Sequence, residues 1–405
     1  MSVTHTITGG LVHLSGNTIE VILTASAPRL NHKLAVKIIC DALMGSPYVE
    51  EIAPLNLVSK FDISGFIDQP VSYNFDFPAI DKAKSHEALA FSVTIDIGEV
   101  WNDQHGVRQE EWNNIAQNNQ LRVLKGKLYP YELALLNEDG KNFASEYIEG
   151  GKFLTNLPNN QVVSPQQEMK LWYLSKWGAN IQILLNLEIE TDPPYFVDED
   201  GEETHHSFQF TEEVLIANAL IEFTINPYFM GFNVPPGTHA PVGTKIIAYS
   251  FWISNYPGGE EFESERRRFV VDNKYYDKEF IFYYVNPKSG VDCIRLVGEY
   301  SEGIKAESDT AYSPVAVGSG TKVASLKTIS SSRQRTWDLN TGIKTRDEML
   351  TLSDFLTSKE RWMIDPDRLY YKRLIPAYIE SGDFPLFDSL KDLQDLNIKI
   401  LEAHK

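Results

Sequence analysis

The stretch FSVTIDI, Phe91–Ile97, alternates apolar and polar residues at every position. Because side chains alternate across a strand, its four apolar residues would lie on one face and its three polar residues on the other. HKLAVKIICDAL, His32–Leu43, repeats this pattern, and two more runs flank the turn Ser15–Asn17. Short strands with one apolar face each predict an antiparallel β-sandwich of immunoglobulin-like size.

Similar strand patterns recur along the chain, so the predicted fold class is mainly β. We expect several antiparallel immunoglobulin-like β-sandwich domains and a small α+β C-terminal portion. The predicted segments are an N-terminal β-sandwich (1–105), a middle β-rich domain (106–235), a third β-sandwich-like domain (236–330) and the α+β portion (331–405).

Two regions interrupt the strand patterns. Trp101–Asn119 is polar with interspersed tryptophans, which predicts a linker or a short helix with a loop. Residues from Gly303 to about Arg335 are rich in Ser, Thr and Gly and show no strong period, so no regular element is assigned to them.

One helix is predicted near the C-terminus, within TRDEMLTLSDFLTS, Thr345–Ser358. Thr345 followed three residues later by Glu348 is a capping-box arrangement. The apolar residues that follow at helical spacing predict an amphipathic helix. These residues are Met349, Leu352, Phe355 and Leu356.

The composition is that of a folded protein, with 42% hydrophobic and 23% charged residues among 405. The net charge of −19 repels phosphate backbones, so nucleic acid is not expected as a partner. The one basic cluster, Arg266–Arg268, is interpreted as a solvated strand face.

The two cysteines, Cys40 and Cys293, lie far apart in the chain and exclude a disulfide framework. The N-terminal residues lack the features of a secretory signal, and no apolar run approaches the roughly 20 residues that span a bilayer. We therefore expect synthesis in a reducing cytoplasm, with no membrane partner.

FIFYYVNPKSGVDCIRLVGEY, Phe280–Tyr300, predicts a hairpin. Phe280–Val285 is an apolar run typical of a strand covered on both faces. Pro287–Gly290 consists mostly of residues typical of turns, and the residues after it are predicted to form the return strand. Cys293 has no histidine nearby in the sequence, so an inert buried thiol is favoured over a nucleophile.

The acidic stretch VDEDGEETHH is a dense group of possible metal ligands, but its glycine comes too early for a calcium loop. We interpret it as a solvated hairpin tip. The candidate ligands are Asp198, Glu199, Asp200, Glu202, Glu203, His205 and His206.

VAVGSGTKV, Val315–Val323, lacks the spacing of a phosphate-binding loop and is interpreted as a flexible loop. Four large aromatic residues could form a sugar-binding platform or pack in cores. They are Trp172, Trp177, Trp252 and Tyr283. No catalytic, cofactor-binding or metal-binding residue is assigned, and no cofactor is expected.

The order of features from Tyr249 to Tyr300 resembles a segment of phage and prophage tail-associated structural proteins. In those proteins a strand ends in a Ser-Glu-Arg-like element. An aspartate-containing loop follows, and then a hairpin whose sequence contains Asn, Gly, Asp and Gly in that order. The matching positions are Ser264, Glu265 and Arg266, then Asp272, then Asn286, Gly290, Asp292 and Gly298. SGNTIEVIL, KFDISGFI, NTGIKTRDEMLTLSDFLTSKERWMI and IPAYIESGD are similar to other parts of the same proteins.

The resemblance implies a non-enzymatic structural component of a phage virion, in the tail, tail tip or neck. We expect it to assemble as a homo-oligomer with other virion proteins. The alternative interpretation is a carbohydrate-binding or adhesive β-sandwich module in contact with a glycan or host surface. An enzyme with an acidic dyad ranks last, because no two carboxylates can be singled out.

Overall fold

The computed structural model is mainly β, with 53% of its residues in strands and 13% in helices. The chain divides into two compact units. The first comprises Met1–Asn273 and Val285–Asp292, and the second comprises Lys274–Tyr284 and Cys293–Lys405. The structure describes residues 3–8, 10, 12–40, 45–68, 73, 77, 81–114, 121–165, 167–175, 181–192, 196–197, 203–204, 210–216, 220–226, 245–255, 263–316, 322–367, 373–385 and 395–403.

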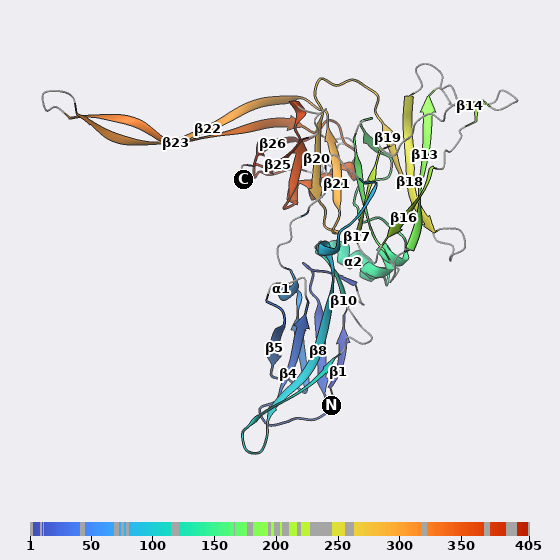
Figure 1. Ribbon diagram of the computed structural model, residues 1–405, viewed down its shortest axis with the longest axis vertical. Helices are drawn as coiled ribbons and strands as arrows, with labels where there is room; N and C mark the ends of the chain where they lie inside the picture. Colours follow the sequence, from blue (N-terminus) through green and yellow to red (C-terminus); the bar gives the residue numbers. More distant parts are fainter. Residues whose placement is uncertain are drawn as a thin grey trace. The chain divides into compact units, whose positions relative to one another are not determined.

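The N-terminal part of the first unit consists of two sheets around one apolar core (Figure 1). One sheet has the order β1-β3-β6, and the other has the order β2-β10-β8-β4-β5, with β9 paired to β8. FSVTIDI lies in β8, and its apolar residues are buried together with Val21 and Phe61 from the other sheet. The bounds are β1 Val3–Ile7, β2 Val12–Leu14, β3 Glu20–Ala25, β4 Lys33–Ile39, β5 Tyr48–Ile52, β6 Val58–Asp62, α1 Ser64–Ile67, β8 Ala90–Asn102, β9 Arg108–Asn114 and β10 Leu121–Leu124.

The linker or short helix predicted over Trp101–Asn119 is wrong for the residues described there. The end of β8 turns at Asp103, whose carboxylate accepts hydrogen bonds from the backbone of His105 and Val107, and β9 runs back antiparallel to β8. Because β9 pairs with a single strand and its residues are polar, it lacks the apolar alternation that marks the neighbouring strands. Residues 115–120 lie outside the described part of the chain.

The rest of the first unit contains a five-stranded sheet, β11-β19-β18-β13-β16, and a three-stranded sheet, β12-β17-β7. A short helix and a single π-helical turn precede β11. The bounds are β7 Ala83–Ser85, η1 Glu87–Leu89, α2 Pro130–Glu138, η2 Ala144–Glu149, β11 Gln161–Val163, β12 Met169–Leu174, β13 Ile181–Asp192, β14 Phe196–Val197, β15 Glu203–Thr204, β16 Phe210–Ile216, β17 Leu220–Ile225, β18 Lys245–Asn255 and β19 Arg267–Val271.

A seven-stranded sheet with the order β21-β20-β24-β25-β26-β23-β22 dominates the second unit. The predicted hairpin is confirmed: β20 and β21 are neighbours and are buried almost throughout. The tip of this hairpin, Val285–Asp292, belongs to the first unit. The bounds are β20 Phe280–Val285, β21 Val291–Leu296, β22 Tyr300–Ala316, β23 Lys322–Asn340, β24 Arg361–Ile364, β25 Leu374–Ile379 and β26 Asn397–Glu402.

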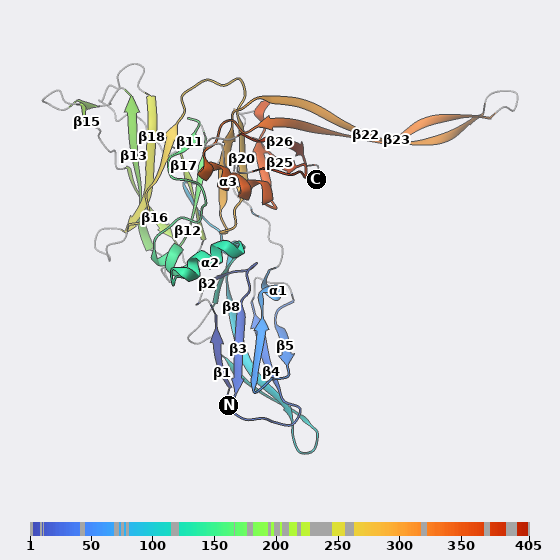
Figure 2. The same cartoon turned by 180° about the vertical axis from the view of Figure 1, so that it is seen from behind.

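The predicted helix is confirmed as α3, Arg346–Thr357, with Thr345 as its N-cap and both hydrogen bonds of the capping box present. Its apolar face packs on the sheet beside β20 (Figure 2). The centroid of the Phe355 ring lies 5.1 Å from that of Phe282 and 5.6 Å from that of Tyr284. Among the helices that the structure describes, none has the length and apolar character needed to cross a membrane.

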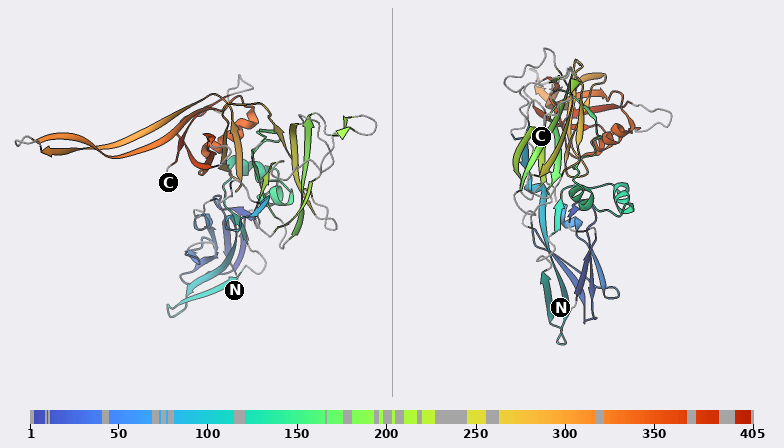
Figure 3. Two further views of the ribbon diagram at one scale, coloured as in Figure 1. Left: turned by 45° about the horizontal axis from the view of Figure 1, so that its top comes forward. Right: turned by 90° about the vertical axis from the view of Figure 1, so that its right-hand side faces the viewer.

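The segment from Gly303 to Arg335, to which no element was assigned, forms most of a long two-stranded ribbon (Figure 3). β22 pairs with β23 along its whole length, and only Thr336–Asn340 of β23 also pairs with β26. Every residue from Ser301 to Thr310 is exposed. With water on both faces the ribbon needs no apolar alternation, so the period that marks half-buried strands is missing from its sequence.

Candidate functional site

An irregular segment of the first unit, Gly151–Asn160, runs between η2 and β11 without helix or strand hydrogen bonding. Phe153 and Leu154 in this segment are 1% and 0% exposed. Buried main-chain groups outside regular structure must find other hydrogen-bond partners. Here some of these partners, Glu265, Asn286 and Asp292, are residues that carry the sequence resemblance.

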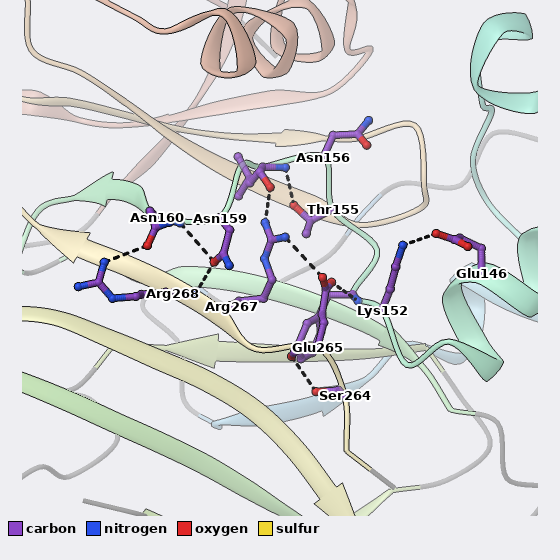
Figure 4. A network of polar contacts seen from close by, with 12 residues as sticks. Glu146, Lys152, Thr155, Asn156, Asn159, Asn160, Ser264, Glu265, Arg267 and Arg268 are labelled. Atoms are coloured by element: carbon purple, nitrogen blue, oxygen red, sulfur yellow. Dashed lines mark hydrogen bonds and ion pairs between the residues drawn. The ribbon is translucent and has the colours of Figure 1, made fainter. Parts of the chain in front are cut away.

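One set of partners precedes and begins β19 (Figure 4). Glu265 donates from its backbone N–H to the carbonyl of Gly151 at 3.0 Å. Its carboxylate accepts from the N–H of Phe153 at 2.8 Å. The guanidinium of Arg267 donates to the carbonyl of Leu157 and lies 3.7 Å from the Glu265 carboxylate. This side of the segment is therefore bound by one acid and one base.

Arg268 extends the same contact to the end of the segment (Figure 4). Its backbone N–H donates to Asn159 Oδ1 at 2.7 Å, and its carbonyl accepts from the N–H of Asn160 at 2.8 Å. Its side chain forms a two-bond contact with Glu190, at 2.8 and 2.7 Å. The strand start is thus aligned with the segment by main chain and side chain together.

The second set of partners comes from the hairpin tip, Val285–Asp292. Asn286 donates from Nδ2 to the carbonyl of Leu154 at 2.8 Å, and Lys288 donates from Nζ to the carbonyl of Thr155 at 3.0 Å. Asp292 accepts from the Thr155 hydroxyl at 2.6 Å. We call Glu265, Arg267, Asn286, Lys288 and Asp292 the clamp, because these side chains hold the segment from two directions.

Asp292 is the most perturbed member of the clamp and is completely buried. Burial raises the pKa of its carboxyl group to about 6, although hydrogen bonds from Thr155, Asn286 and the backbone of Asn156 and the charge of Lys288 act in the opposite direction. The carboxylate is therefore held in a low-dielectric site by partners that compensate only part of its lost hydration.

Gly290 lies where the hairpin tip meets the segment most closely. A Cβ atom at this position would lie 2.5 Å from the carbonyl oxygen of Leu154 and 3.2 Å from the Cβ of Trp172. Because the nearest atom belongs to the main chain and cannot rotate away, the position requires glycine. Close approach, and not an unusual φ angle, explains this residue.

The clamp is suited to holding a fold together. Its carboxylates and cations point at main-chain groups or at one another, and Asp292 is 0% exposed, so substrate cannot reach it without opening the unit. No group of three or more His, Cys, Asp or Glu residues within the described part of the chain is placed to bind a metal ion.

Three other residues of the resemblance have local structural roles. Ser264 accepts from the N–H of Ile253 at 3.0 Å, and Asp272 donates from its backbone to the carbonyl of Val163 at 2.9 Å. In the second unit, a Cβ on Gly298 would lie 2.5 Å from the carbonyl oxygen of Asn340. The resemblance therefore marks positions under packing and main-chain constraints.

The interpretation of Arg266–Arg268 as a solvated strand face holds only in part. Arg266 is exposed, pairs with Glu263 at 2.9 Å and lies 4.0 Å over the Trp252 ring. Arg267 is only 9% exposed, because it belongs to the clamp. Alternation along the strand separates the two side chains, which a composition argument cannot do.

Both cysteines are buried, and neither forms a disulfide. The acidic stretch lies largely outside the described residues, and only the main chain of Val197 at the end of β14 and of β15 is described within it. The central part of the glycine-rich loop, residues 317–321, also lies outside them. Trp172, Trp252 and Tyr283 are 1%, 6% and 0% exposed and offer no open sugar platform, and Trp177 is among the residues not described.

A buried ion cluster on the three-stranded sheet of the first unit was missed by the sequence reasoning. Glu222 accepts from Lys170 Nζ at 2.7 Å and contacts His86 Nε2 at 2.8 Å, while Lys170 also donates to the Thr224 hydroxyl at 2.7 Å. Burial alone would raise the pKa of Glu222, but the bonds and charges of His86 and Lys170 outweigh it and lower that pKa. Single charged residues within the apolar runs MKLWYL and LIEFTI were the available signal.

A hollow of about 470 Å³ lies in the N-terminal part of the first unit, between the β3–β4 and β5–β6 connections. Its lining residues are Pro28, Arg29, His32, Ala53, Pro54, Asn56 and Leu57. The fully buried carboxylate of Glu99 lies 3.0 Å from Arg29 and 3.5 Å from His32. The guanidinium of Arg29 also lies 3.8 Å over the Trp101 ring.

No protein-family model matches this chain, and no curated protein sequence is significantly similar to it. The roles of the clamp, the hollow and the ribbon are therefore inferred from their own geometry.

Proposed function

We propose that this protein is a non-enzymatic structural component of a phage virion, in the tail, the tail tip or a neck ring, and that it works through protein–protein assembly. The β22–β23 ribbon is the observation that carries this proposal. An isolated two-stranded ribbon is marginally stable in water. With 17 residues, β22 spans about 56 Å, so the ribbon reaches well beyond what its own sheet can cover.

The clamp supports the same proposal from another direction. Three of the residues that resemble phage tail-associated proteins, Glu265, Asn286 and Asp292, bind the segment Gly151–Asn160. A structural protein retains such residues for shape, whereas an enzyme retains residues that reach a substrate. We also propose that the two-sheet N-terminal part is immunoglobulin-like, since one core lies between its sheets.

The proposed partners are further copies of this chain and other virion proteins, and the proposed location is the virion after synthesis in the bacterial cytoplasm. A net charge of −19 gives no attraction to nucleic acid or to anionic membrane surfaces, so neither is proposed as a partner.

The test is the protein content of purified phage particles that encode this chain. We expect mass spectrometry to find it at a fixed copy number, and immunogold labelling to place it at the tail or neck. Particles that are complete and infectious without the protein would overturn the proposal. Phage lacking the gene, complemented by a wild-type copy, provide the control.

A carbohydrate-binding or adhesive role is the second candidate, and the hollow favours it. Arg29 and His32 combine polar groups with the apolar surface of Pro28 and Pro54, as a sugar site does. We expect specific glycan-array binding that is lost in Arg29→Ala if this role is real, with exposed Arg266→Ala as the control. An array without hits, or hits that survive Arg29→Ala, would exclude the hollow as a glycan site.

A further inference from the structure

The two strands of the ribbon each have a main-chain edge without a partner among the described residues. β22 is the last strand of its sheet, so its outer edge is open from Tyr300 to Ala316. On β23, the edge opposite β22 pairs with β26 only from Thr336 to Asn340, so Lys322–Arg335 is open. Exposed strand edges are templates for pairing with another chain.

The open edges differ in charge. From Tyr300 to Ala316, β22 carries three acids, Glu302, Glu307 and Asp309, against the single base Lys305. From Lys322 to Arg335, β23 carries four bases and no acid. The four bases are Lys322, Lys327, Arg333 and Arg335. A wholly basic strand segment is unusual in a chain whose net charge is −19.

The part of the ribbon available for pairing is bounded on the distal side. The register shifts between Asp309 and Thr310, and Pro314 lacks the N–H that a ladder needs. The regular stretch of β22 is therefore Ser301–Asp309, all of it exposed. Of the residues of β23 that face this stretch, Ser330–Arg333 are exposed as well, and Ile329 at the register shift is 72% exposed.

We propose that the ribbon pairs edge to edge with the ribbon of a second copy of this chain, the outer edge of β22 lying antiparallel against the open edge of β23 of the neighbour. This inference deepens the proposed function, on which it rests, by naming the partner of the ribbon. Pairing over Ser301–Asp309 would form roughly nine main-chain hydrogen bonds, the number found in an ordinary protein interface.

Charge selects this pairing over the symmetric ones. β22 against β22 would place Glu302, Glu307 and Asp309 beside the same residues of the neighbour, and like charges on adjacent strands repel. β23 against β23 would do the same with lysines and arginines. Because the favoured contact joins two different edges, it is heterologous and repeats from copy to copy, which gives a ring if the rotation closes.

The experiment reverses charge on one edge at a time and measures solution mass by light scattering at several concentrations. One variant carries Glu307→Lys and Asp309→Lys on β22, and the other carries Lys327→Glu and Arg333→Glu on β23. We expect each to need about tenfold or more higher concentration for half-assembly than the wild type, because the β22 variant makes both edges basic and the β23 variant removes the net positive charge of its edge. All four substitutions in one chain place bases on β22 and acids on β23, and should recover assembly relative to the β22 variant.

Two controls separate edge pairing from general effects. Glu138→Lys with Asp139→Lys changes the net charge equally on the exposed end of α2 and should leave the mass unchanged. A chain in which Ala306–Arg333 is replaced by Asn-Gly keeps the body and the base of the ribbon, and it should be monomeric with a far-UV spectrum that loses only the strand contribution of the deleted residues. Assembly by this shortened chain would overturn the proposal.

The outcomes also separate this inference from the virion role. A monomeric wild type, or single-edge variants that assemble normally, would exclude ribbon pairing between copies. If the shortened chain nevertheless failed to enter particles, the virion role would stand and the ribbon would bind a different virion protein. Ribbon-dependent assembly of a protein absent from particles would leave the inference standing without the virion role.

Discussion

The hairpins β20–β21 and β22–β23 follow one another in the chain and are stabilised in opposite ways. β20 and β21 are buried at almost every position, and the side chains of their tip bind the segment Gly151–Asn160. β22 and β23 are paired over a much greater length, yet their exposed part is supported by little beyond its own main-chain hydrogen bonds. The longer of the two hairpins is therefore the one with fewer buried residues among those that the structure describes.

The difference matters for what each hairpin can do. A buried polar side chain satisfies several partners at once, so a single change leaves many groups uncompensated. An exposed pair in a ribbon can be exchanged with small effect on stability. The first hairpin is consequently constrained by folding, whereas the second is free to change with a partner.

The largest expected effect is that of Asp292→Ala. Removing this buried carboxylate leaves the Thr155 hydroxyl without its acceptor and Lys288 without its nearby opposite charge. We expect a loss of about 3–5 kcal/mol in the free energy of unfolding, measured by urea denaturation. Asp309→Ala in the ribbon, the matched control, should change it by less than about 0.5 kcal/mol. Equal losses in the two variants would remove the contrast between the hairpins.

The same residue should make stability depend on pH. The pKa of Asp292 is raised from 3.8 to about 6, so the folded protein binds this proton more tightly than the unfolded chain does. Its stabilising contribution is therefore complete below pH about 4 and is lost as the pH rises through about 6. Relative to Asp292→Asn, the wild type should lose about 3 kcal/mol between pH 3 and 8. A difference between the two proteins that stays constant with pH would contradict the assignment.

A pair of glycine substitutions tests the contrast more finely. Gly290→Ala would place a Cβ 2.5 Å from the main-chain oxygen of Leu154, and we expect a loss of about 1–3 kcal/mol. Gly303→Ala in β22 approaches only the hydroxyl of Thr336, at 2.9 Å, which can rotate. There alanine should be neutral, or stabilise by about 0.5 kcal/mol, because strand glycine loses more backbone freedom. Thermal unfolding of both variants checks the sign of each effect.

The smallest effect is expected at the base of the ribbon. Arg335 donates to Glu402 at 2.9 Å and to the buried carboxylate of Asp365 at 3.3 and 3.4 Å. Arg335→Gln should destabilise the second unit by about 1 kcal/mol, because Asp365 loses a charged donor. Lys305→Gln, which breaks an exposed pair with Glu307, should have no measurable effect. Indistinguishable melting curves for the two variants would show that the contacts of Arg335 stabilise the second unit no more than the exposed pair of Lys305 does.

Those elements with one or two buried faces could be predicted from the sequence. The alternation of apolar and polar residues in FSVTIDI predicts a strand with one buried face, and the unbroken apolar run Phe280–Val285 predicts a strand buried on both faces. Thr345 with Glu348 marks the start of α3. The ribbon could not be recognised, since neither of its faces meets a core. β9 was not predicted for a similar reason, because it is an edge strand made mostly of polar residues.

Three of the five clamp residues, Glu265, Asn286 and Asp292, were singled out by the resemblance, but their partners could not be predicted. Asp292 and Thr155 are 137 positions apart, and no local pattern links them. Lys170 and Glu222 did carry a signal, as lone charges within apolar strands, although it does not say which charges meet. Which distant polar residues meet depends on the order of the strands in the sheets. The periodicity of apolar residues does not predict that order.

The position of the hairpin tip in the chain delays the folding of the first unit during synthesis. The first unit takes in residues up to Asn273 and then Val285–Asp292, so its fold is incomplete until Asp292 has left the ribosome. At 5–20 residues per second, Thr155 waits roughly 7 to 30 s for its partner. During that interval the main chain of Gly151–Asn160 lacks its hydrogen bonds with Asn286, Lys288 and Asp292, so a nascent chain paused there leaves unpaired main-chain groups that the complete fold buries.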